Sequence, residues 1–239
     1  MMDPAPLSAW PLRIDGAMPQ GFDHTCAVWL LDRRLDGGRA QELACRVLDV
    51  HERQRLGALR RDSDRRTYAL AHVGLRMLLG GVLGAAPRDI VFGRDACPEC
   101  GGPHGRPAVA DAPVHFSLSH SEGYAMIALA RTPVGVDLER VPGRQVLEVI
   151  QALHPDETAE LLAVPEALRP AEFTRVWTRK EAYLKGLGSG LGRSPALDYV
   201  GAGHPDGPPA QVPAWRLAEV SAPQGYCAAL ATMEGEGGA

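Results

Sequence analysis

Residues 172–186 carry the clearest helical pattern of the chain and also its only two lysines, Lys180 and Lys185. Every other basic residue is arginine, whose wide planar guanidinium does not replace the compact, rotatable ammonium of lysine. Glu181 follows Lys180 directly and could act as a metal ligand or as a base, although an ordinary Glu–Lys pair on a helix surface is the simpler alternative. Lys180 borders the apolar side, from which its ammonium could extend to solvent. Apolar side chains recur at helical spacing and predict one buried face, formed by Phe173, Val176, Trp177, Leu184 and Leu187.

An alternating segment, residues 134–141, predicts a strand. Successive side chains of a strand point to opposite faces, so Asp137 and Glu139 project to one side and Val136 and Leu138 to a core. Two neighbouring carboxylates repel each other unless a positive group lies between them. Mg²⁺ meets this need because it prefers oxygen ligands and takes few protein carboxylates. A solvated acidic face is the alternative.

A third pattern ends a strand at a tight turn, where Ser119, His120 and Ser121 follow one another. Hydroxyl and imidazole groups at such a position can donate hydrogen bonds to a phosphate. A serine–histidine nucleophile pair is less consistent with the pattern, because neighbours on a strand face opposite ways. A turn histidine without a special role is the remaining alternative.

The Gly- and Pro-rich segment 97–107 predicts a loop with two separate features. Cys97, Cys100 and His104 resemble part of a zinc site, but a structural zinc takes four ligands and no second ligand pair lies nearby in sequence. Arg106 follows closely and could cover an anion. The role of the cysteines stays open.

Composition excludes several classes of protein. A formal net charge of −4 gives no reason to expect nucleic acid or an anionic membrane as the main partner. No apolar run approaches the length of a membrane span, and residues 1–20 lack the basic start and apolar core of a secretory signal. Five cysteines do not indicate a disulfide scaffold in a chain of this length. We therefore expect a cytoplasmic protein with reduced thiols.

The order of expected elements predicts an α/β fold in which each half contains a strand, helices and further strands. Expected strands are residues 26–31, 114–119, 124–130, 134–141, 215–220 and 226–231, and expected helices are residues 42–59, 62–80, 147–153, 157–162 and 172–186. The predicted division is an irregular leader (1–20), an N-terminal subdomain (21–133), a C-terminal subdomain (134–232) and a disordered tail (233–239).

Together, these segments resemble the Sfp-type 4′-phosphopantetheinyl transferases over residues 25–230. The most specific motifs are Gly-x-Asp-x-Glu at 135–139 and Trp-x-x-Lys-Glu-x-x-x-Lys at 177–185. Gly-Arg-Pro at 105–107 and Ser-x-Ser-His-Ser at 117–121 add to them, and the arginine-rich segments 52–55 and 64–68 are similar to the family's amino-terminal half.

The resemblance implies a monomeric pseudo-dimer of two similar α/β subdomains with the active site in the cleft between them. Such an enzyme moves the 4′-phosphopantetheine arm of coenzyme A to a serine of an acyl or peptidyl carrier protein and releases 3′,5′-ADP. Which carriers are served, and which acyl-coenzyme A derivatives are tolerated, is left open by the sequence.

The resemblance also gives roles to residues of the C-terminal half. Asp137, Glu139 and Glu181 would hold Mg²⁺ on the pyrophosphate of coenzyme A. Glu181, directly or through a water, would take the proton of the carrier serine. Lys185 would neutralise the charge that develops as the phosphoanhydride breaks, and Lys180 would support it.

Contacts with coenzyme A are implied mainly for residues of the N-terminal half. His120 and Ser119 would bind a phosphate, whereas Arg106, Arg53 and Arg66 would contact the adenosine end and its 3′-phosphate. Arg65 is the alternative to Arg66, because the register of that helix is ambiguous.

The sequence is also compatible with two other functions. One is a Mg²⁺-dependent coenzyme A or nucleotide pyrophosphatase, which would use the same carboxylates with water as the nucleophile. The other is a non-catalytic interaction module with zinc at Cys97 and Cys100.

Overall fold

The structure, a computed structural model, describes residues 6–143, 147–202 and 210–235. The chain divides into two compact units, each with its own sheet and core. One unit comprises Ala9–Gly93 and Pro107–Arg131, and the other comprises Met1–Ser8, Arg94–Arg106 and Thr132–Ala239. The first is called the N-terminal unit below and the second the C-terminal unit. The mixed helices and sheets confirm the predicted α/β fold class.

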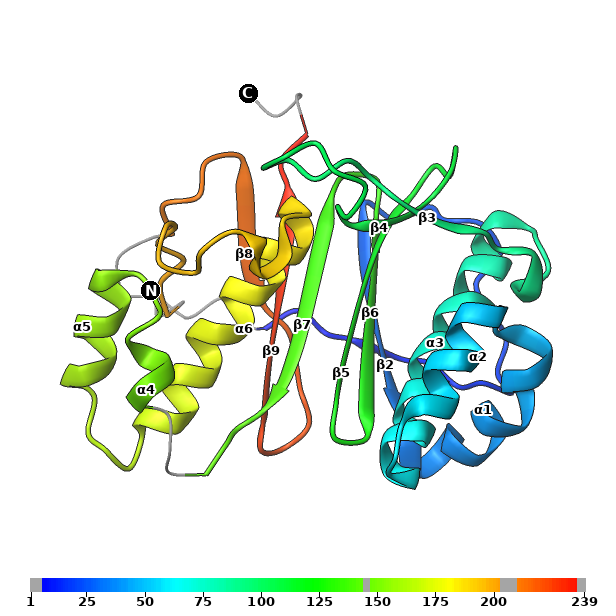
Figure 1. Cartoon of the computed structure of the whole chain (residues 1–239), viewed down its shortest axis with the longest axis horizontal. Helices are drawn as coiled ribbons and strands as arrows, with labels where there is room; N and C mark the ends of the chain where they lie inside the picture. The colour runs from blue at the N-terminus through cyan, green and yellow to red at the C-terminus, as the bar shows by residue number, and fades with distance from the viewer. Residues whose placement is uncertain (1–5, 144–146, 203–209, 236–239) are drawn as a thin grey trace. The chain divides into compact units, whose positions relative to one another are not determined.

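The N-terminal unit contains a four-stranded sheet in the order β1-β2-β6-β5. β6 pairs antiparallel with both β2 and β5, and α3 runs along one face of the sheet (Figure 1). A two-stranded sheet of β3 and β4 follows η1. The strands are β1 (Trp10–Pro11), β2 (Cys26–Asp32), β3 (Phe92–Arg94), β4 (Pro107–Val109), β5 (His115–Ser121) and β6 (Tyr124–Ala130), and the helices are α1 (Arg33–Val47), α2 (Val50–Ala58), α3 (Asp62–Leu83) and η1 (Pro87–Asp89).

A buried arginine joins α2 to α3 inside the N-terminal unit. The Arg76 guanidinium is 0% exposed and donates to Glu52 at 2.6 Å and to Asp49 at 2.7 Å. It also donates to the carbonyl oxygens of Pro87 and Ile90. A buried charge is costly unless it is paired and hydrogen-bonded, so this network fixes α2 against α3.

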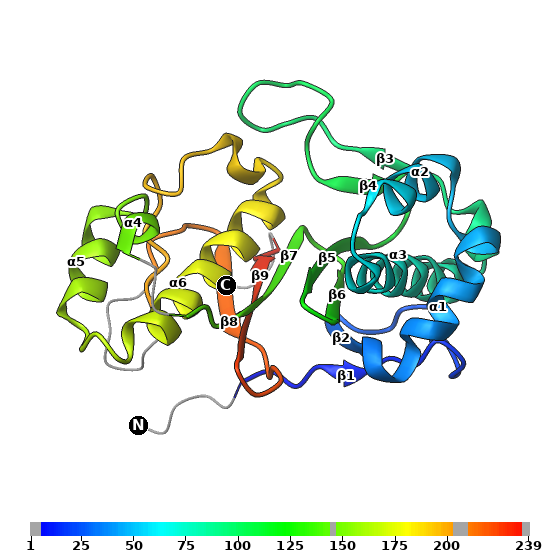
Figure 2. The ribbon, with the colours of Figure 1, turned by 60° about the horizontal axis from the view of Figure 1, so that its bottom comes forward.

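The C-terminal unit contains a three-stranded antiparallel sheet in the order β7-β9-β8. The long helix α6 runs along this sheet, and Figure 2 shows it beside β7 and β9. Phe173, Val176 and Leu184 of α6 are buried in the core, as the apolar stripe predicted. The elements are β7 (Val134–Arg140), α4 (Leu147–Ile150), α5 (Pro155–Ala163), α6 (Arg169–Leu187), η2 (Gly190–Gly192), β8 (Trp215–Glu219) and β9 (Tyr226–Met233).

The two units share a strand order when each is followed along its own chain. In both, the first long strand pairs with the last strand, and the last pairs with the one before it: β2-β6-β5 in one unit and β7-β9-β8 in the other. Helices separate the first strand from the later two in both units. This common topology supports the expected repeat of α/β subdomains, whereas their assembly as a pseudo-dimer stays a prediction.

The structure corrects two expectations about the first sixty residues. The prediction of a single helix over residues 42–59 is wrong. The chain is extended at Leu48, where α1 has ended, and α2 begins after Asp49. Asp49 caps α2 reciprocally with Glu52, which favours a helix start at this point. The leader is largely irregular where described, but Leu12 and Ile14 pack into the core, at 4% and 1% exposed.

The predicted leader (1–20) and the predicted tail (233–239) lie partly outside the described residues. Within the described residues, no helix combines the length and apolar character needed to cross a membrane.

Candidate functional site

The site begins with an unusually close approach of β7 to α6. Gly135 faces the helix backbone, and a Cβ there would lie 1.9 Å from the Ala182 carbonyl oxygen and 2.4 Å from the Gly186 amide nitrogen. Any other residue would push the two elements apart, so glycine is required at this position. Asp137 lies two residues further along β7 and projects to the same face, toward α6.

This approach brings an acidic and a basic residue from distant parts of the sequence into an ion pair. Lys185 Nζ lies 2.6 Å from Asp137 Oδ1, and it also donates to the Val136 carbonyl at 3.4 Å. The Asp137 side chain is 2% exposed and that of Lys185 is 30% exposed. The ammonium therefore neutralises a buried carboxylate while remaining accessible to a ligand.

Glu181 lies one helical turn before Lys185 and forms the second carboxylate of the site. Burial raises the pKa of Glu181 above its usual value, repulsion from Asp137 adds to the rise, and Lys185 opposes it. A raised pKa makes the ionised carboxylate a stronger base. The structure thus brings together Asp137, Glu181 and Lys185, three of the predicted site residues.

The donors at this site fit Mg²⁺ in their chemistry. Asp137 and Glu181 offer carboxylate oxygens, and their repulsion is the kind of interaction that a hard divalent cation relieves. Glu139 is half-buried two residues beyond Asp137, on the same face of β7.

Lys180 lies apart from this group, and the expectation that its side chain would extend to solvent is wrong. Its side chain is 1% exposed, and Nζ lies 2.8 Å from Glu157, which is 0% exposed. Nζ also donates to the Asp198 carbonyl oxygen. Burial lowers the pKa of Lys180 below its usual value, and the Glu157 charge opposes this. The predicted support of Lys185 by Lys180 at the coenzyme A site stays a prediction.

Arg106 contacts the last turn of α6 at Gly186, the residue after Lys185. Its Nη1 donates to the Gly186 carbonyl oxygen at 2.7 Å, and its Nε donates to Asp95 Oδ2 at 2.7 Å. A cation at a helix C-terminus interacts favourably with the helix dipole. The guanidinium is 20% exposed, so it keeps an accessible edge for an anion.

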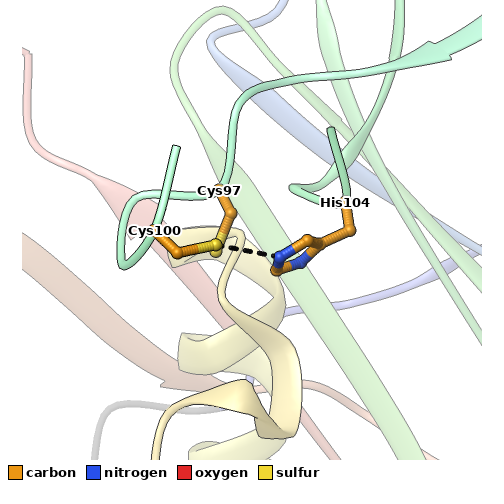
Figure 3. A group of neighbouring side chains, drawn as sticks. All are labelled: Cys97, Cys100 and His104. Atoms are coloured by element: carbon orange, nitrogen blue, oxygen red, sulfur yellow. Dashed lines mark hydrogen bonds between the residues drawn. The ribbon is translucent and has the colours of Figure 1, made fainter. Parts of the chain in front are cut away.

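The loop before Arg106 contains a separate group of metal-ligating side chains. Cys97, Cys100 and His104 place one ligand atom each within 4.8 Å of the others, and Figure 3 shows the His104 ring directed at the Cys100 sulfur. Backbone N–H groups of Glu99 and Cys100 donate toward Cys97 and hold the pKa of its thiol below the usual value. The sequence spacing indicated this set but not its convergence.

Ser119 and His120 occupy the end of β5, in the N-terminal unit. They pair in register with Met126 and Ala125 of β6. Ser119 is buried and His120 is exposed, as expected for neighbours on opposite faces of a strand. His120 is therefore accessible at the end of its strand, whereas the Ser119 hydroxyl lies within the folded unit.

Arg65 and Arg66 differ in what they bind inside the N-terminal unit. Arg65 Nη1 donates to the carbonyl oxygens of Leu59 and Arg60, which holds the chain between α2 and α3. Arg66 makes an exposed pair with Asp62 at 2.7 Å, an interaction of the kind that contributes little to stability. Arg53 is exposed on α2 and donates to the Leu48 carbonyl. Arg66 and Arg53 are thus freer than Arg65 to exchange their partners for an anion.

Two acidic residues that hold this machinery in place were missed by the sequence reasoning. Glu157 pairs with Lys180 from 23 positions away, and no local pattern marks it. Asp95 pairs with Arg106, and both lie at the base of one loop, where the Asp95 amide donates to the Arg106 carbonyl oxygen at 3.0 Å. The only signal in the sequence was that the acidic Asp95 and the basic Arg106 stand at opposite ends of the same loop.

Comparisons with known proteins agree with this arrangement. The family model described as "4'-phosphopantetheinyl transferase superfamily" matches residues 133–231, which include β7 and α6. The 4'-phosphopantetheinyl transferase HetI of Nostoc sp. is 28% identical over 88% of this chain and 88% of its own length. The 4'-phosphopantetheinyl transferase gsp of Aneurinibacillus migulanus is 30% identical over 51% of this chain and 48% of its own. The 4'-phosphopantetheinyl transferase Sfp of Bacillus subtilis is 29% identical over 37% and 40%, respectively.

The elements that carry Asp137, Glu181 and Lys185 thus lie within the region that matches the transferase family model. Residues 133–231 match the 4′-phosphopantetheinyl transferase superfamily, and the chain is similar over most of its length to a curated protein named as such a transferase. This finding confirms the resemblance and the enzyme class that the motifs at 135–139 and 177–185 predicted.

Proposed function

We propose that this protein transfers the 4′-phosphopantetheine arm of coenzyme A to a serine of an acyl or peptidyl carrier protein. The serine oxygen bonds to the phosphorus that carries pantetheine, the pyrophosphate bridge breaks, and 3′,5′-ADP leaves. The observation that carries the proposal is the contact of Lys185 with Asp137 beside Glu181, a carboxylate whose pKa is raised. The match to this superfamily supports the same reaction.

Asp137, Glu139 and Glu181 would hold Mg²⁺. The cation would supply positive charge to the pyrophosphate and reduce the repulsion between the carboxylates. The carboxylates support this assignment, because Mg²⁺ prefers oxygen ligands and a divalent cation relieves the repulsion between Asp137 and Glu181.

Glu181 would accept the proton of the carrier serine, directly or through a water. Its place one helical turn before Lys185 and near Asp137 supports this role, because the base must lie beside the groups that hold the reacting phosphate. Lys185 would neutralise charge on the departing phosphate, because its ammonium is partly exposed at the site. Lys180 would support Lys185 by position, since its buried pair with Glu157 fixes the helix that carries both lysines.

The remaining predicted residues would contact coenzyme A through its phosphates and adenosine end. Arg106 offers an accessible guanidinium edge at the last turn of α6. His120 is exposed at the end of β5, and Ser119 precedes it. We favour Arg66 over Arg65 for the 3′-phosphate, together with Arg53, because the Arg65 guanidinium is already bonded to backbone carbonyls.

The release of 3′,5′-ADP tests the reaction and separates it from its nearest alternative. We expect release from coenzyme A to require an apo carrier protein, and to stop when the carrier serine is replaced by alanine. A coenzyme A pyrophosphatase, which would use the same carboxylates with water, releases the nucleotide without any carrier. Equal rates of nucleotide release with and without carrier would therefore contradict the transferase and support the pyrophosphatase.

We further propose a cytoplasmic, monomeric enzyme. The common topology of the two units supports a monomer, because each chain then contains both halves of a repeat. Light scattering coupled to gel filtration should give the mass of one chain, 25.6 kDa. A single species of twice that mass would contradict the monomer.

A further inference from the structure

Cys97, Cys100 and His104 form a compact three-residue cluster in the loop 95–106. Cys100 Sγ lies 3.0 Å from His104 Nε2, and one ligand atom of each residue lies within 4.8 Å of the other two. Cys97 is buried, whereas Cys100 and His104 are exposed, so an ion could reach the cluster from solvent. All five cysteines are free thiols in the structure.

The backbone of the loop holds the three side chains in this arrangement. The Gly101 amide donates to the Cys97 carbonyl oxygen at 2.8 Å, and the Cys97 amide donates to the Gly102 carbonyl oxygen at 2.8 Å. Gly101 has a φ of 72°, which glycine adopts without strain. The turn is therefore closed by its own hydrogen bonds, and amide groups of Glu99 and Cys100 point at the Cys97 sulfur.

We propose that Cys97, Cys100 and His104 bind one Zn²⁺, with a water or another external ligand completing the tetrahedral set. Two sulfurs and one imidazole favour zinc over Mg²⁺, which requires oxygen ligands. This zinc site is distinct from the carboxylates of β7 and α6 in both residues and metal preference. It also differs from the interaction module considered from the sequence, because the loop is part of the unit that contains the carboxylates.

The zinc would hold Arg106 in place. Only Gly105 separates His104 from Arg106, and a Cβ on Gly105 would lie 2.5 Å from the Asp95 carbonyl oxygen, so this part of the loop is tightly packed. Gly105 donates to the Asp95 carbonyl at 3.0 Å, and Arg106 bonds both Asp95 and the Gly186 carbonyl of α6. A metal that joins residues 97, 100 and 104 would rigidify the loop on which Arg106 reaches the end of α6.

Metal analysis of the purified full chain tests the proposal. We expect about one zinc per chain in the wild-type protein after dialysis against metal-free buffer. Cys100→Ser and His104→Ala should each lower the zinc content at least about tenfold, because second-sphere changes alone already cost 10–100-fold in affinity. Cys45→Ser is the matched control, since Cys45 is an exposed cysteine on α1 and should keep the full zinc content. Wild-type protein that holds no zinc, or variants that hold as much as wild type, would overturn the proposal.

Cobalt substitution gives a second readout that does not depend on activity or folding yield. Co²⁺ added to metal-free protein should produce sulfur-to-metal charge-transfer absorption in wild type and in Cys45→Ser. Cys100→Ser should lose part of that absorption while its circular dichroism stays that of a folded protein. Absence of charge-transfer absorption in wild type, or a Cys97–Cys100 disulfide found by non-reducing peptide mapping in zinc-free protein, would contradict metal binding.

Discussion

Lys185 and Asp137 are 48 positions apart in sequence, yet Nζ and Oδ1 lie 2.6 Å apart. The contact depends on α6 running against β7, and the paired glycines Gly135 and Gly186 permit that approach. The ammonium is thereby fixed beside Asp137 and one turn from Glu181. Catalysis of phosphoryl transfer depends mainly on such positioning of charge.

Lys185→Ala should lower the rate of carrier modification by about 10²–10³-fold, the usual cost of removing one charge-stabilising group from an active site. Lys185→Arg should also be impaired, because the planar guanidinium is wider than the ammonium that fits beside Asp137. Initial rates of holo-carrier formation measure both effects. Arg39→Ala, at an exposed pair on α1, is the control. A Lys185→Ala rate within a few-fold of wild type would contradict the role of this residue.

Gly135→Ala should destabilise the C-terminal unit by about 1–3 kcal/mol or more, because the added methyl group meets the backbone of α6 rather than a movable side chain. Thermal unfolding measures the loss. Gly57→Ala is a matched control, since a Cβ there meets nothing within 4 Å. Alanine should be neutral or stabilising at that helical position. Equal stability of the two variants would mean that β7 and α6 are less closely packed than the structure has them.

Lys180→Met should cost about 3–5 kcal/mol of unfolding free energy, because it leaves the Glu157 carboxylate buried without its cation. The double variant Lys180→Met/Glu157→Leu should recover part of that loss, since no unpaired charge then remains at the site. Denaturant unfolding of both variants gives the coupling between the residues. If the single and double variants are equally unstable, the ion pair is not what fixes α6.

Acid should weaken the N-terminal unit through Glu52. Burial opposes ionisation of Glu52, but hydrogen bonds from His72 and from the Asp49 amide, and the charge of Arg76, outweigh it and hold the pKa of Glu52 below its usual 4.5. A carboxyl whose pKa is lowered by folding stabilises the folded state above the unfolded pKa, and that stabilisation is lost as pH falls through the folded value.

We therefore expect the contribution of Glu52 to the free energy of unfolding to be complete above about pH 5. This contribution should fall progressively below the ordinary pKa of Glu52. Glu52→Gln should be less stable than wild type at neutral pH, and its stability should depend less on pH in the acid range. Urea unfolding at a series of pH values measures this dependence. Parallel pH profiles for the two proteins would show that Glu52 does not contribute.

Periodicity and alternation predicted the local elements that carry the site. The apolar stripe on α6 and the alternation of Asp137 and Glu139 on β7 determined which residues face the core and which could bind ligands. Those patterns are local, so they did not show which residue neutralises a buried charge. Lys180 borders the apolar face, so its ammonium was expected to be able to reach solvent. Its partner Glu157 lies on α5, and nothing in the intervening sequence links the two residues.

Helix boundaries and the cysteine loop show the same limit. Helix-forming residues continue through 42–59, but the cap at Asp49 outweighed them and divided the segment. The spacing of Cys97, Cys100 and His104 indicated metal ligands, whereas their convergence required the turn at Gly101. Tertiary pairing and turn geometry decide such details.

The most direct test of the proposed reaction is the intact mass of an apo carrier protein incubated with this enzyme, coenzyme A and Mg²⁺. We predict a gain of one phosphopantetheine per carrier, absent without metal and absent with Glu181→Gln. Glu42→Gln, at an exposed glutamate on α1, should retain the gain. An unchanged mass across fatty-acid, polyketide and peptide-type carriers, or full modification by Glu181→Gln, would contradict the account.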